Sequence, residues 1–558
     1  MNDLRRTLLW SVFAVSLLML WDGWLRHTGQ ASLFAPAPTV AEAPASAASV
    51  TGVPSAPVAA QAAAPAVVSS ASAPAAPHEL ITVTTDVVKA TVDSDGGSLV
   101  KVELLKHKSQ QADQNMVVLD KTAAHTYVAE TGLIGSAAGQ TLPNHTTPFV
   151  VVSKDRELAP GAESLVLTLE SAPVNGIKLV KTYTFKRGDY AIAVKQDVVN
   201  ASGSAIRPTL YLQLTRDGST AEANSNPASF MGGPVAYTGM AVYNAKGKYQ
   251  KLAFDKLAEG KVEFEKADDN GWVAMVQHHF ASAWLQNDPV QREFYGKKLA
   301  TNLYATGMLF GLGDIAAGQS KSFESTLFVG PQEENKLKAL APGLEYTKDY
   351  GWTHIMAAPL FWLLDKLHGA IGNWGWAIVA LVVLLKAAFY WLNASAYRSM
   401  AKMKALNPRI QQLRENMKDN PQQMQQEMLK IYREEKVNPI GGCLPILIQI
   451  PVFIALYSVL SSSVEIRNAP WIGWIVDLSV KDPFYVLPAL MTLSTLLQTW
   501  LNPTPPDPVQ AKMMWIMPLL FSVMFFFFPA GLVLYWLTNN ILSIAQQWFI
   551  NKQLGVTQ

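Results

Sequence analysis

The sequence predicts a multi-domain membrane protein with one N-terminal anchor, a large antiparallel β domain outside the membrane, and five further α-helical spans. Apolar and polar residues alternate with a period of two over 79–343, and long apolar runs recur after residue 372. The stretch 372–392 has the length of a membrane span and carries a single charge, Lys386. Hydrophobic residues make up 49% and charged residues 16% of the 558 residues, which suits a membrane protein with a sizeable water-facing part.

Composition excludes several classes of function. The net charge of +2 is too small to indicate nucleic-acid binding, and we expect no specific nucleic-acid partner. Cys443 is the single cysteine, so the chain has no intramolecular disulfide and no cysteine metal cluster. No motif indicates a cofactor, a metal site or a catalytic residue, and we predict a protein that is not an enzyme.

The N-terminus, 1–27, has the pattern of a signal anchor. Arg5 and Arg6 precede an apolar run from 8 to about 24, which is the short end of a membrane span. A cleaved signal peptide is the alternative, but Trp21 to Trp24 follow the run where small residues would be needed. The positive-inside rule then keeps the N-terminus cytoplasmic. Residues 28–78 consist mainly of Ala, Pro, Ser and Val, and we interpret them as a disordered tether.

The alternating region 79–343 predicts a large β-sandwich. Strand-like runs flank the turn signals Asp95-Gly96-Gly97 and Arg187-Gly188-Asp189. No apolar run of 18 residues interrupts the region, so we expect it to lie wholly on the far side of the membrane. His278 and His279 form the most tempting candidate site. We interpret them as part of a core strand, where adjacent side chains point to opposite faces and cannot easily share a ligand.

Residues 352–371 predict an amphipathic helix at the membrane surface, followed by the span 372–392. We expect its apolar stripe to contain Met356, Leu360, Leu363, Leu364, Leu367 and Ile371. Because the β domain is external, the span runs inward and Lys386 lies in its cytoplasmic half.

Residues 394–438 predict a cytoplasmic helical hairpin. Nine Lys/Arg against five Asp/Glu between Arg398 and Lys436 fit an internal loop. Apolar residues, many of them methionines, recur every three or four positions on both sides of 418–421. Asn420 as N-cap and Pro421 at the first helical position suit the start of the second helix. A self-packed hairpin accounts for much of this pattern, and a tip exposed to a partner is the additional hypothesis.

Four further spans are predicted at about 440–463, 483–501, 513–528 and 531–550, which gives six spans and a cytoplasmic C-terminus. A charge inside a span costs about 2.5–3.5 kcal/mol on insertion scales. Lys386 either faces a hydrophilic cavity open to the cytoplasm or snorkels to the nearby surface. The residues alone leave both interpretations open.

Three stretches in the membrane part carry a resemblance to a known family: NPIGGCLPILIQIPVFIALY at 438–457, PAGLVLYWLTNN at 529–540, and the GNWGW span with its lysine. They resemble the YidC/Oxa-type membrane protein insertases, and the likeness covers nearly the whole chain. The resemblance implies a bacterial inner-membrane protein whose β domain is periplasmic and similar to sugar-mutarotase sandwiches, or β-supersandwiches, a likeness of fold that does not imply catalysis.

The resemblance also implies a function and a set of site residues. The protein would insert and fold nascent membrane proteins, alone or with the Sec translocon and its accessory subunits, through a hydrophilic groove open to the cytoplasm and lipid bilayer. The ribosome and the signal-recognition targeting machinery would contact the hairpin tip at Arg414 and Asp419. The groove residues implied for substrate contact are Lys386, Gln449, Phe453, Met491, Tyr535 and Trp536.

This chain differs from relatives at three positions of the membrane part, and two other functions are alternatives to insertion. Many relatives have arginine where this chain has Lys386, some have threonine at the position of Val382, and one has a second tyrosine at the position of Trp536. A secondary transporter using Lys386 as a substrate or proton site is the first rival, although no internal repeat typical of transporters is found. A membrane-anchored carbohydrate-binding protein is the second, but five further spans exceed what anchoring requires.

Overall fold

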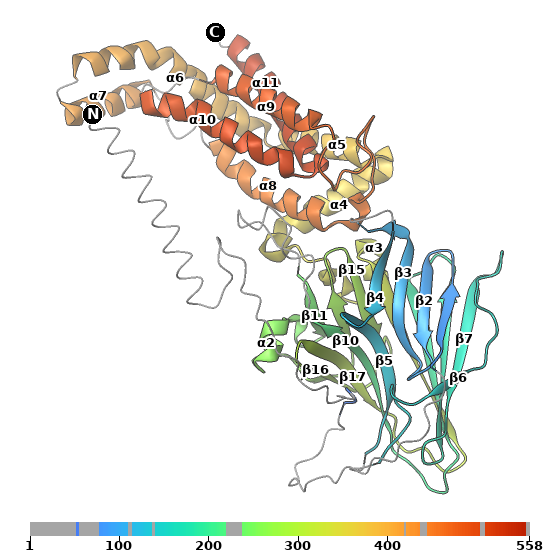
Figure 1. Ribbon diagram of the computed structural model, residues 1–558. Helices are drawn as coiled ribbons and strands as arrows, with labels where there is room; N and C mark the ends of the chain where they lie inside the picture. The colour runs from blue at the N-terminus through green and yellow to red at the C-terminus, as the bar shows by residue number, and fades with distance from the viewer. Residues whose placement is uncertain are drawn as a thin grey trace. The chain divides into compact units, whose positions relative to one another are not determined.

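The computed structural model describes residues 52–54, 78–109, 114–136, 140–218, 237–417, 420–435, 444–502 and 508–553. The predicted anchor 1–27 lies outside the described residues, as does the predicted tether except for 52–54 and 78. Figure 1 shows the strands, the later helices and the course of the chain.

The β domain begins at Leu80, and its strands extend to residue 331. Their bounds are β1 Leu80–Thr84, β2 Val88–Asp93, β3 Ser98–Lys108, β4 Asn115–Lys121, β5 Thr126–Ile134, β6 Phe149–Val151, β7 Ser164–Ser171, β8 Ile177–Lys186, β9 Ala191–Asn200, β10 Thr209–Asp217, β11 Gly239–Asn244, β12 Lys248–Leu252, β13 Ala267–Asp268, β14 Trp272–Val276, β15 Phe280–Leu285, β16 Arg292–Ala300, β17 Leu303–Gly311 and β18 Ser320–Pro331. Two short helices accompany them, α2 Phe254–Ala258 and α3 Glu334–Leu340.

Within the described residues the strands form two antiparallel sheets of nine strands each. Sheet one has the order β1-β2-β3-β4-β5-β10-β17-β16-β13, and sheet two the order β12-β11-β14-β15-β18-β9-β8-β7-β6. The turns predicted at 95–97 and 187–189 connect β2 to β3 and β8 to β9, as the alternation indicated. Gly96, Gly97 and Gly188 have positive φ values there, a conformation that glycine adopts without steric cost. The predicted antiparallel β-sandwich is confirmed.

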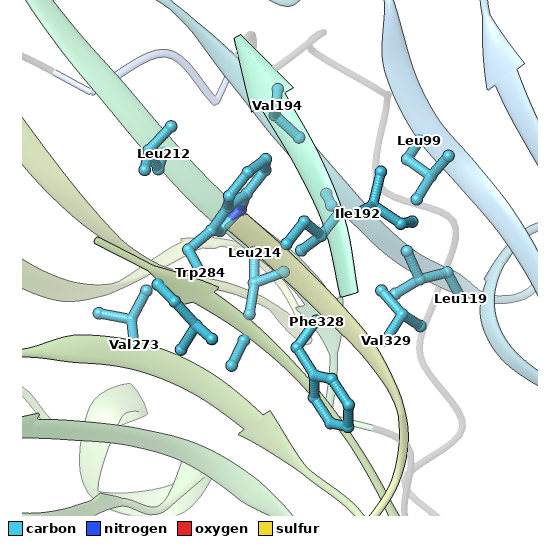
Figure 2. Close-up of a cluster of buried hydrophobic side chains, with 14 of the residues drawn as sticks. Leu99, Leu119, Ile192, Val194, Leu212, Leu214, Val273, Trp284, Phe328 and Val329 are labelled. Atoms are coloured by element: carbon cyan, nitrogen blue, oxygen red, sulfur yellow. The ribbon is translucent and has the colours of Figure 1, made fainter. Parts of the chain in front are cut away.

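The core lies between the two sheets because alternate side chains of each strand point inward. Figure 2 shows this packing, with side chains of both sheets gathered around Trp284. Leu99, Leu119, Leu212 and Leu214 come from sheet one, and Ile192, Val194, Val273, Trp284, Phe328 and Val329 come from sheet two. All ten are 2% exposed or less. The Trp284 indole also donates a hydrogen bond across to the carbonyl of Gln213, at 3.0 Å, so its one polar group is satisfied.

Two buried cations are held by backbone carbonyls of the domain. Lys181 Nζ donates to the carbonyls of Gly96 and Thr131, at 2.7 and 2.8 Å, and burial lowers the pKa of Lys181 to about 7. Arg292 is 1% exposed and donates five hydrogen bonds of 2.6–3.0 Å. The acceptors are the carbonyls of Val290, Gly271, Gln286, Asp269 and Asp288. Arg292 thus fixes the two loops at 269–271 and 286–290 to β16.

The prediction that His278 and His279 belong to a core strand is wrong. The two residues lie in the turn between β14 and β15, which pair as a hairpin. Because a turn does not impose the alternation of a strand, their rings stack with centroids 3.9 Å apart and an interplanar angle of 18°. Burial, with His278 alongside, holds the pKa of His279 well below its ordinary value. A parallel stack does not direct two ring nitrogens at one ligand.

The helical part extends from η3 Gly351–Thr353 to the last described residue. Its α-helices are α4 His354–Ile371, α5 Trp374–Ala388, α6 Tyr390–Asn416, α7 Pro421–Glu434, α8 Leu444–Ser462, α9 Val486–Leu501, α10 Pro508–Met524 and α11 Ala530–Gln553. Short 3₁₀ turns are η2 Leu344–Thr347, η4 Val464–Ile466 and η5 Phe525–Phe527. Judged by length and apolar content, no single described helix is sufficient to cross a membrane, whereas the bent pair Trp374–Ala388 and Tyr390–Met403 would be.

A bend separates α5 from α6, which the sequence did not predict. The two helices meet at Phe389 with an angle of 66° between them. The predicted span 372–392 therefore comprises α5 and the first residues of α6. Helix α6 then continues as the first helix of the hairpin. The second hairpin helix, α7, begins as predicted. The Asn420 side chain accepts a hydrogen bond from the amide of Gln423, and Pro421 stands at the first helical position.

The packed face of α4 differs from the predicted stripe. Ala357, Phe361 and Leu364 are its buried residues, and of these only Leu364 belongs to the stripe predicted to face the membrane surface. The ring of Phe361 lies 3.4 Å from Lys348 Nζ, and Lys348 pairs with Glu465 at 3.0 Å. This buried ion pair and cation–π contact select the face of α4 that packs inward, which periodicity alone could not reveal because apolar residues occupy both faces. Met356 and Ile371 of the predicted stripe are exposed.

Candidate functional site

The first turn of α5 is anchored at three points. The Asn373 side chain accepts from the amide of Trp376 and donates to the carbonyls of Pro470 and Trp471, each at 3.1 Å. Gly375 faces Trp471 so closely that a Cβ atom would collide with the indole. The rings of Trp374 and His368 stack at 3.9 Å. These contacts fix the start of the helix that carries Lys386 about three turns later.

Lys386 lies in the last turn of α5 and is half-buried. Its Nζ donates to the hydroxyl of Ser543 on α11, at 2.7 Å. Ser543 in turn donates to the carbonyl of Asn539, at 2.7 Å, which fixes the direction of its hydroxyl proton. The partner of the ammonium is therefore a neutral hydroxyl. A charge so held is not neutralised by this partner and can still attract an anion.

Lys386 lines a small hollow that is partly open to its surroundings. Helices α5, α6, α8 and α11 all contribute to its wall. The lining residues are Val382, Leu385, Lys386, Phe389, Leu392, Asn393, Gln449, Val452, Tyr535 and Asn539. The wall thus combines an apolar majority with one cation and a few amide and hydroxyl groups, as in many binding sites.

Four more of the predicted groove residues form a cluster beside Lys386. Gln449 donates a hydrogen bond from its amide to the Tyr535 hydroxyl, which links α8 to α11. Phe453, one turn after Gln449, contacts Trp536 edge to face with ring centroids 4.8 Å apart. Trp536 also contacts Phe525, at 5.3 Å. The structure therefore brings Lys386, Gln449 and Tyr535 into one hollow, with Phe453 and Trp536 next to them.

Met491 does not line this hollow. It is 1% exposed on α9, and its carbonyl accepts the hydroxyls of Ser494 and Thr495. The same two hydroxyls accept hydrogen bonds from Asn540 of α11, at 3.2 and 2.9 Å. Met491 thus belongs to the packing of α9 on α11. Sequence spacing could not separate this role from substrate contact because both call for an inward-facing apolar residue.

The structure describes only one of the two residues predicted at the hairpin tip. Arg414 lies near the end of α6, and Asp419 lies outside the described residues. Near the base of the hairpin, Arg409 of α6 approaches Glu434 and Glu435 at the end of α7, at 3.9 and 3.4 Å. All three side chains are about half exposed, so these ion pairs add little stability.

Sequence reasoning did not assign Ser543 or Asn539 to the site. Both are polar residues of the predicted span 531–550, and their spacing of four places them on one face of a helix. That spacing was the available signal. Which of the many polar residues of α11 meets Lys386 depends on the rotation of α11 against α5, which only packing determines. Within the described residues no group of three or more His, Cys, Asp or Glu side chains is arranged to hold a metal ion.

Comparison with known proteins identifies the family. A family model described as the YidC periplasmic domain matches residues 80–363, and one described as 60Kd inner membrane protein matches residues 366–556. The "Membrane protein insertase YidC" of Cupriavidus metallidurans is 54% identical over 558 residues, covering 99% of this chain and 98% of that protein. The chain belongs to the YidC family. The protein of the same name from Ralstonia nicotianae is 51% identical and covers 100% of this chain and 99% of its own length.

A solved structure described as an active YidC insertase with its first transmembrane domain resolved is also similar. It covers 84% of this chain and 92% of its own, with 19% identity and a TM-score of 0.39. The two family descriptions fit a YidC-type chain of the inner membrane whose β domain is periplasmic. The division between the two matched regions falls within α4, between Leu363 and Lys366, at the passage from the β domain to the membrane helices.

Proposed function

We propose that this chain is a membrane protein insertase that accepts nascent membrane proteins at the bacterial inner membrane. Its full-length relatives bear the name membrane protein insertase, which is not the name of an enzyme or of a transporter. The observation in this chain that best supports the proposal is the hollow around Lys386. It offers a cation whose hydrogen-bond partner is a neutral hydroxyl, surrounded by apolar side chains.

Two properties of the hollow suit a membrane-protein client. The ammonium attracts acidic residues in a segment that must pass outward, and its hydrogen bond to Ser543 is easily exchanged for one to a carboxylate. Phe453, Trp536 and the apolar lining offer contact to the client's hydrophobic helix as it moves into lipid. In this proposal Gln449 and Tyr535 hold α8 and α11 together beside the path.

The finer topology belongs to the same proposal. Six spans would place both termini in the cytoplasm and the β domain in the periplasm, with α4 along the membrane surface. Supporting this, α4 exposes Ile355 (86%) and Trp362 (60%), large apolar side chains suited to an interface with lipid. The bent pair α5–α6 would supply the first core span.

Thiol accessibility at position 386 tests the proposed groove. In a Cys443→Ala chain we would place one cysteine at 386 and, as control, one at Val383, which is 47% exposed but does not line the hollow. We expect a membrane-impermeant reagent to label 386 from the cytoplasmic side, and a nascent client to crosslink there and not at 383. If the cysteine at 386 is neither labelled by the reagent nor crosslinked to a client, position 386 does not face a water-filled substrate groove.

The proposed cytoplasmic partners are the ribosome, the targeting machinery and the Sec translocon, with delivery through the hairpin α6–α7. The hairpin is joined to the rest of the helical part mainly through α6, and its charged residues near Arg409 are exposed. Deleting 405–430 should therefore leave the hollow and β domain folded while lowering client delivery several-fold, as measured by insertion from ribosome-bound chains. Wild-type insertion by a folded deletion variant would argue against this role for the hairpin.

A further inference from the structure

Three residues of the predicted tether lie on the β domain. Val53 packs on a small cluster made of Ile134, Tyr211 and Leu309, beside Tyr295. Pro54 is buried, and the carbonyl of Gly52 accepts a hydrogen bond from Gln213 Nε2 at 3.5 Å. These contacts come from β5, β10, β16 and β17, which are neighbours in sheet one.

The contacted face is the outward face of sheet one, away from the core. Leu210, Leu212 and Leu214 of β10 belong to the core between the sheets, so Tyr211, Gln213 and Thr215 point the other way. Yet these three outward side chains are only 0, 0 and 4% exposed. An outward face that is buried and rich in polar groups is unusual for a sheet, and we call these covered side chains the floor of the site.

A hydrogen-bond network fixes the polar groups of this floor. Gln213 Nε2 donates to Glu130 Oε2 at 2.8 Å, and its Oε1 accepts the Tyr295 hydroxyl at 2.7 Å. Thr215 donates to the same oxygen of Glu130, at 2.6 Å. His145 Nδ1 lies 2.5 Å from the Tyr211 hydroxyl. The Gln213 NH₂ group also donates to the Thr215 hydroxyl at 2.9 Å, so its two short hydrogen bonds lie within the network and the Gly52 carbonyl is a longer, third contact at 3.5 Å.

Two glycines make room for the tyrosines that line the floor. Gly307 lies between Gln213 and Tyr295 in the strand register, and a Cβ there would collide with the Tyr295 ring. Gly132 lies opposite Tyr211, and a Cβ there would be 2.6 Å from the Tyr211 hydroxyl. Each tyrosine ring can therefore lie across the sheet above a glycine. Together the two rings form an apolar trough between the polar groups.

We propose that this outward face is an intramolecular peptide-binding site whose ligand is the Gly52-Val53-Pro54 segment of the chain's own linker. The segment matches the site chemically. It is uncharged, Val53 supplies an apolar side chain that packs on Ile134, Tyr211 and Leu309, and the Gly52 carbonyl makes a long contact of 3.5 Å with the Gln213 amide. Gly52 has a φ of +64°, a conformation that an L side chain rarely adopts, so the ligand is specific in its backbone as well as in its side chains.

Binding of this segment divides the linker into two parts. With 52–54 held on the β domain, residues 28–51 alone connect the predicted anchor to the domain, instead of 28–77. Since the reach of a chain is limited to about 3.3–3.6 Å per residue, the bound state halves the distance over which the domain can move from the anchor. Release of the segment would extend that distance. The inference does not depend on the insertase proposal.

Thiol labelling of the purified full chain tests the site without an insertion assay. In the Cys443→Ala background, a cysteine replacing Val53 should react at least tenfold more slowly than one replacing Ser49. Gly52→Ala should raise the rate at position 53 about tenfold, because a left-handed alanine costs about one to two kcal/mol, of which 1.4 corresponds to a factor of ten. The matched control is Gly161→Ala, at φ +81° with open space around its Cβ position, which should leave the rate unchanged.

Competition then distinguishes a binding site from a permanent structural contact. A synthetic peptide spanning 46–60, at millimolar concentration, should raise the labelling rate at position 53 by displacing the linker, whereas a scrambled peptide should not. Equal labelling at 53 and 49 would overturn the docking itself. Slow labelling that the peptide leaves unchanged would overturn the proposal of an exchangeable ligand site.

Discussion

Replacing Lys386 with alanine should reduce the insertion of clients with acidic external segments about tenfold. Two opposite charges 4 Å apart interact by about 4 kcal/mol at an effective dielectric constant of 20, and partial exposure of Lys386 reduces this to the order of 1.4 kcal/mol, a factor of ten. Lys386→Arg keeps the charge and should retain activity. The measurement is insertion of a client series into proteoliposomes that contain the purified variants.

Two controls make this result specific. Lys512→Ala removes an exposed lysine of α10 that does not line the hollow, and it should have little effect. A client whose external segment carries no acidic residue should be inserted equally by the wild type and by Lys386→Ala. If the alanine variant inserts acidic clients at the wild-type rate, the ammonium has no part in client recognition, and the lysine serves only to support the packing of α5 on α11.

Replacing Arg292 with lysine should destabilise the β domain by about 3 kcal/mol or more, although the charge is conserved. Lysine has three N–H donors in place of the five that Arg292 uses, so at least two of these partly buried carbonyls lose their partners, at about 1–3 kcal/mol each. Burial already lowers the pKa of Arg292 to about 10 despite the nearby Asp269, Asp268 and Asp288. Burial would also lower the pKa of a lysine at this position, so the lysine would lose its proton more readily than Arg292 does.

Thermal unfolding of the β domain within the detergent-solubilised chain, followed by strand circular dichroism, measures this loss. A domain of this size should show a fall in Tm of about 6–12 °C. The matched control is Arg187→Lys. Arg187 also donates to two loop carbonyls, those of Ala162 and Ala159, but at an exposed site where water can replace it. Equal shifts for the two variants would show that buried carbonyls do not govern the effect.

The sequence by itself determined features that depend on local properties of the chain. Alternation and glycine-containing turns predicted the hairpins around 95–97 and 187–189, because a strand period and a positive φ are local properties of the chain. The start of α7 at Asn420 and Pro421 was equally local, since a cap needs only its own first turn. Lys386 could be singled out because the cost of a charge in an apolar span depends on the span alone.

Other features depend on contacts between distant segments, and only the tertiary structure decided them. The pairing of β10 with β5 and β17, the inward face of α4 and the meeting of Lys386 with Ser543 all join residues that no local pattern relates. The stacked pair His278 and His279 was misjudged because a turn of a few residues inside an apolar run leaves almost no signal. Val53 is the extreme case. One valine among several in an Ala/Pro-rich linker packs on the β domain only because folding creates the surface that receives it.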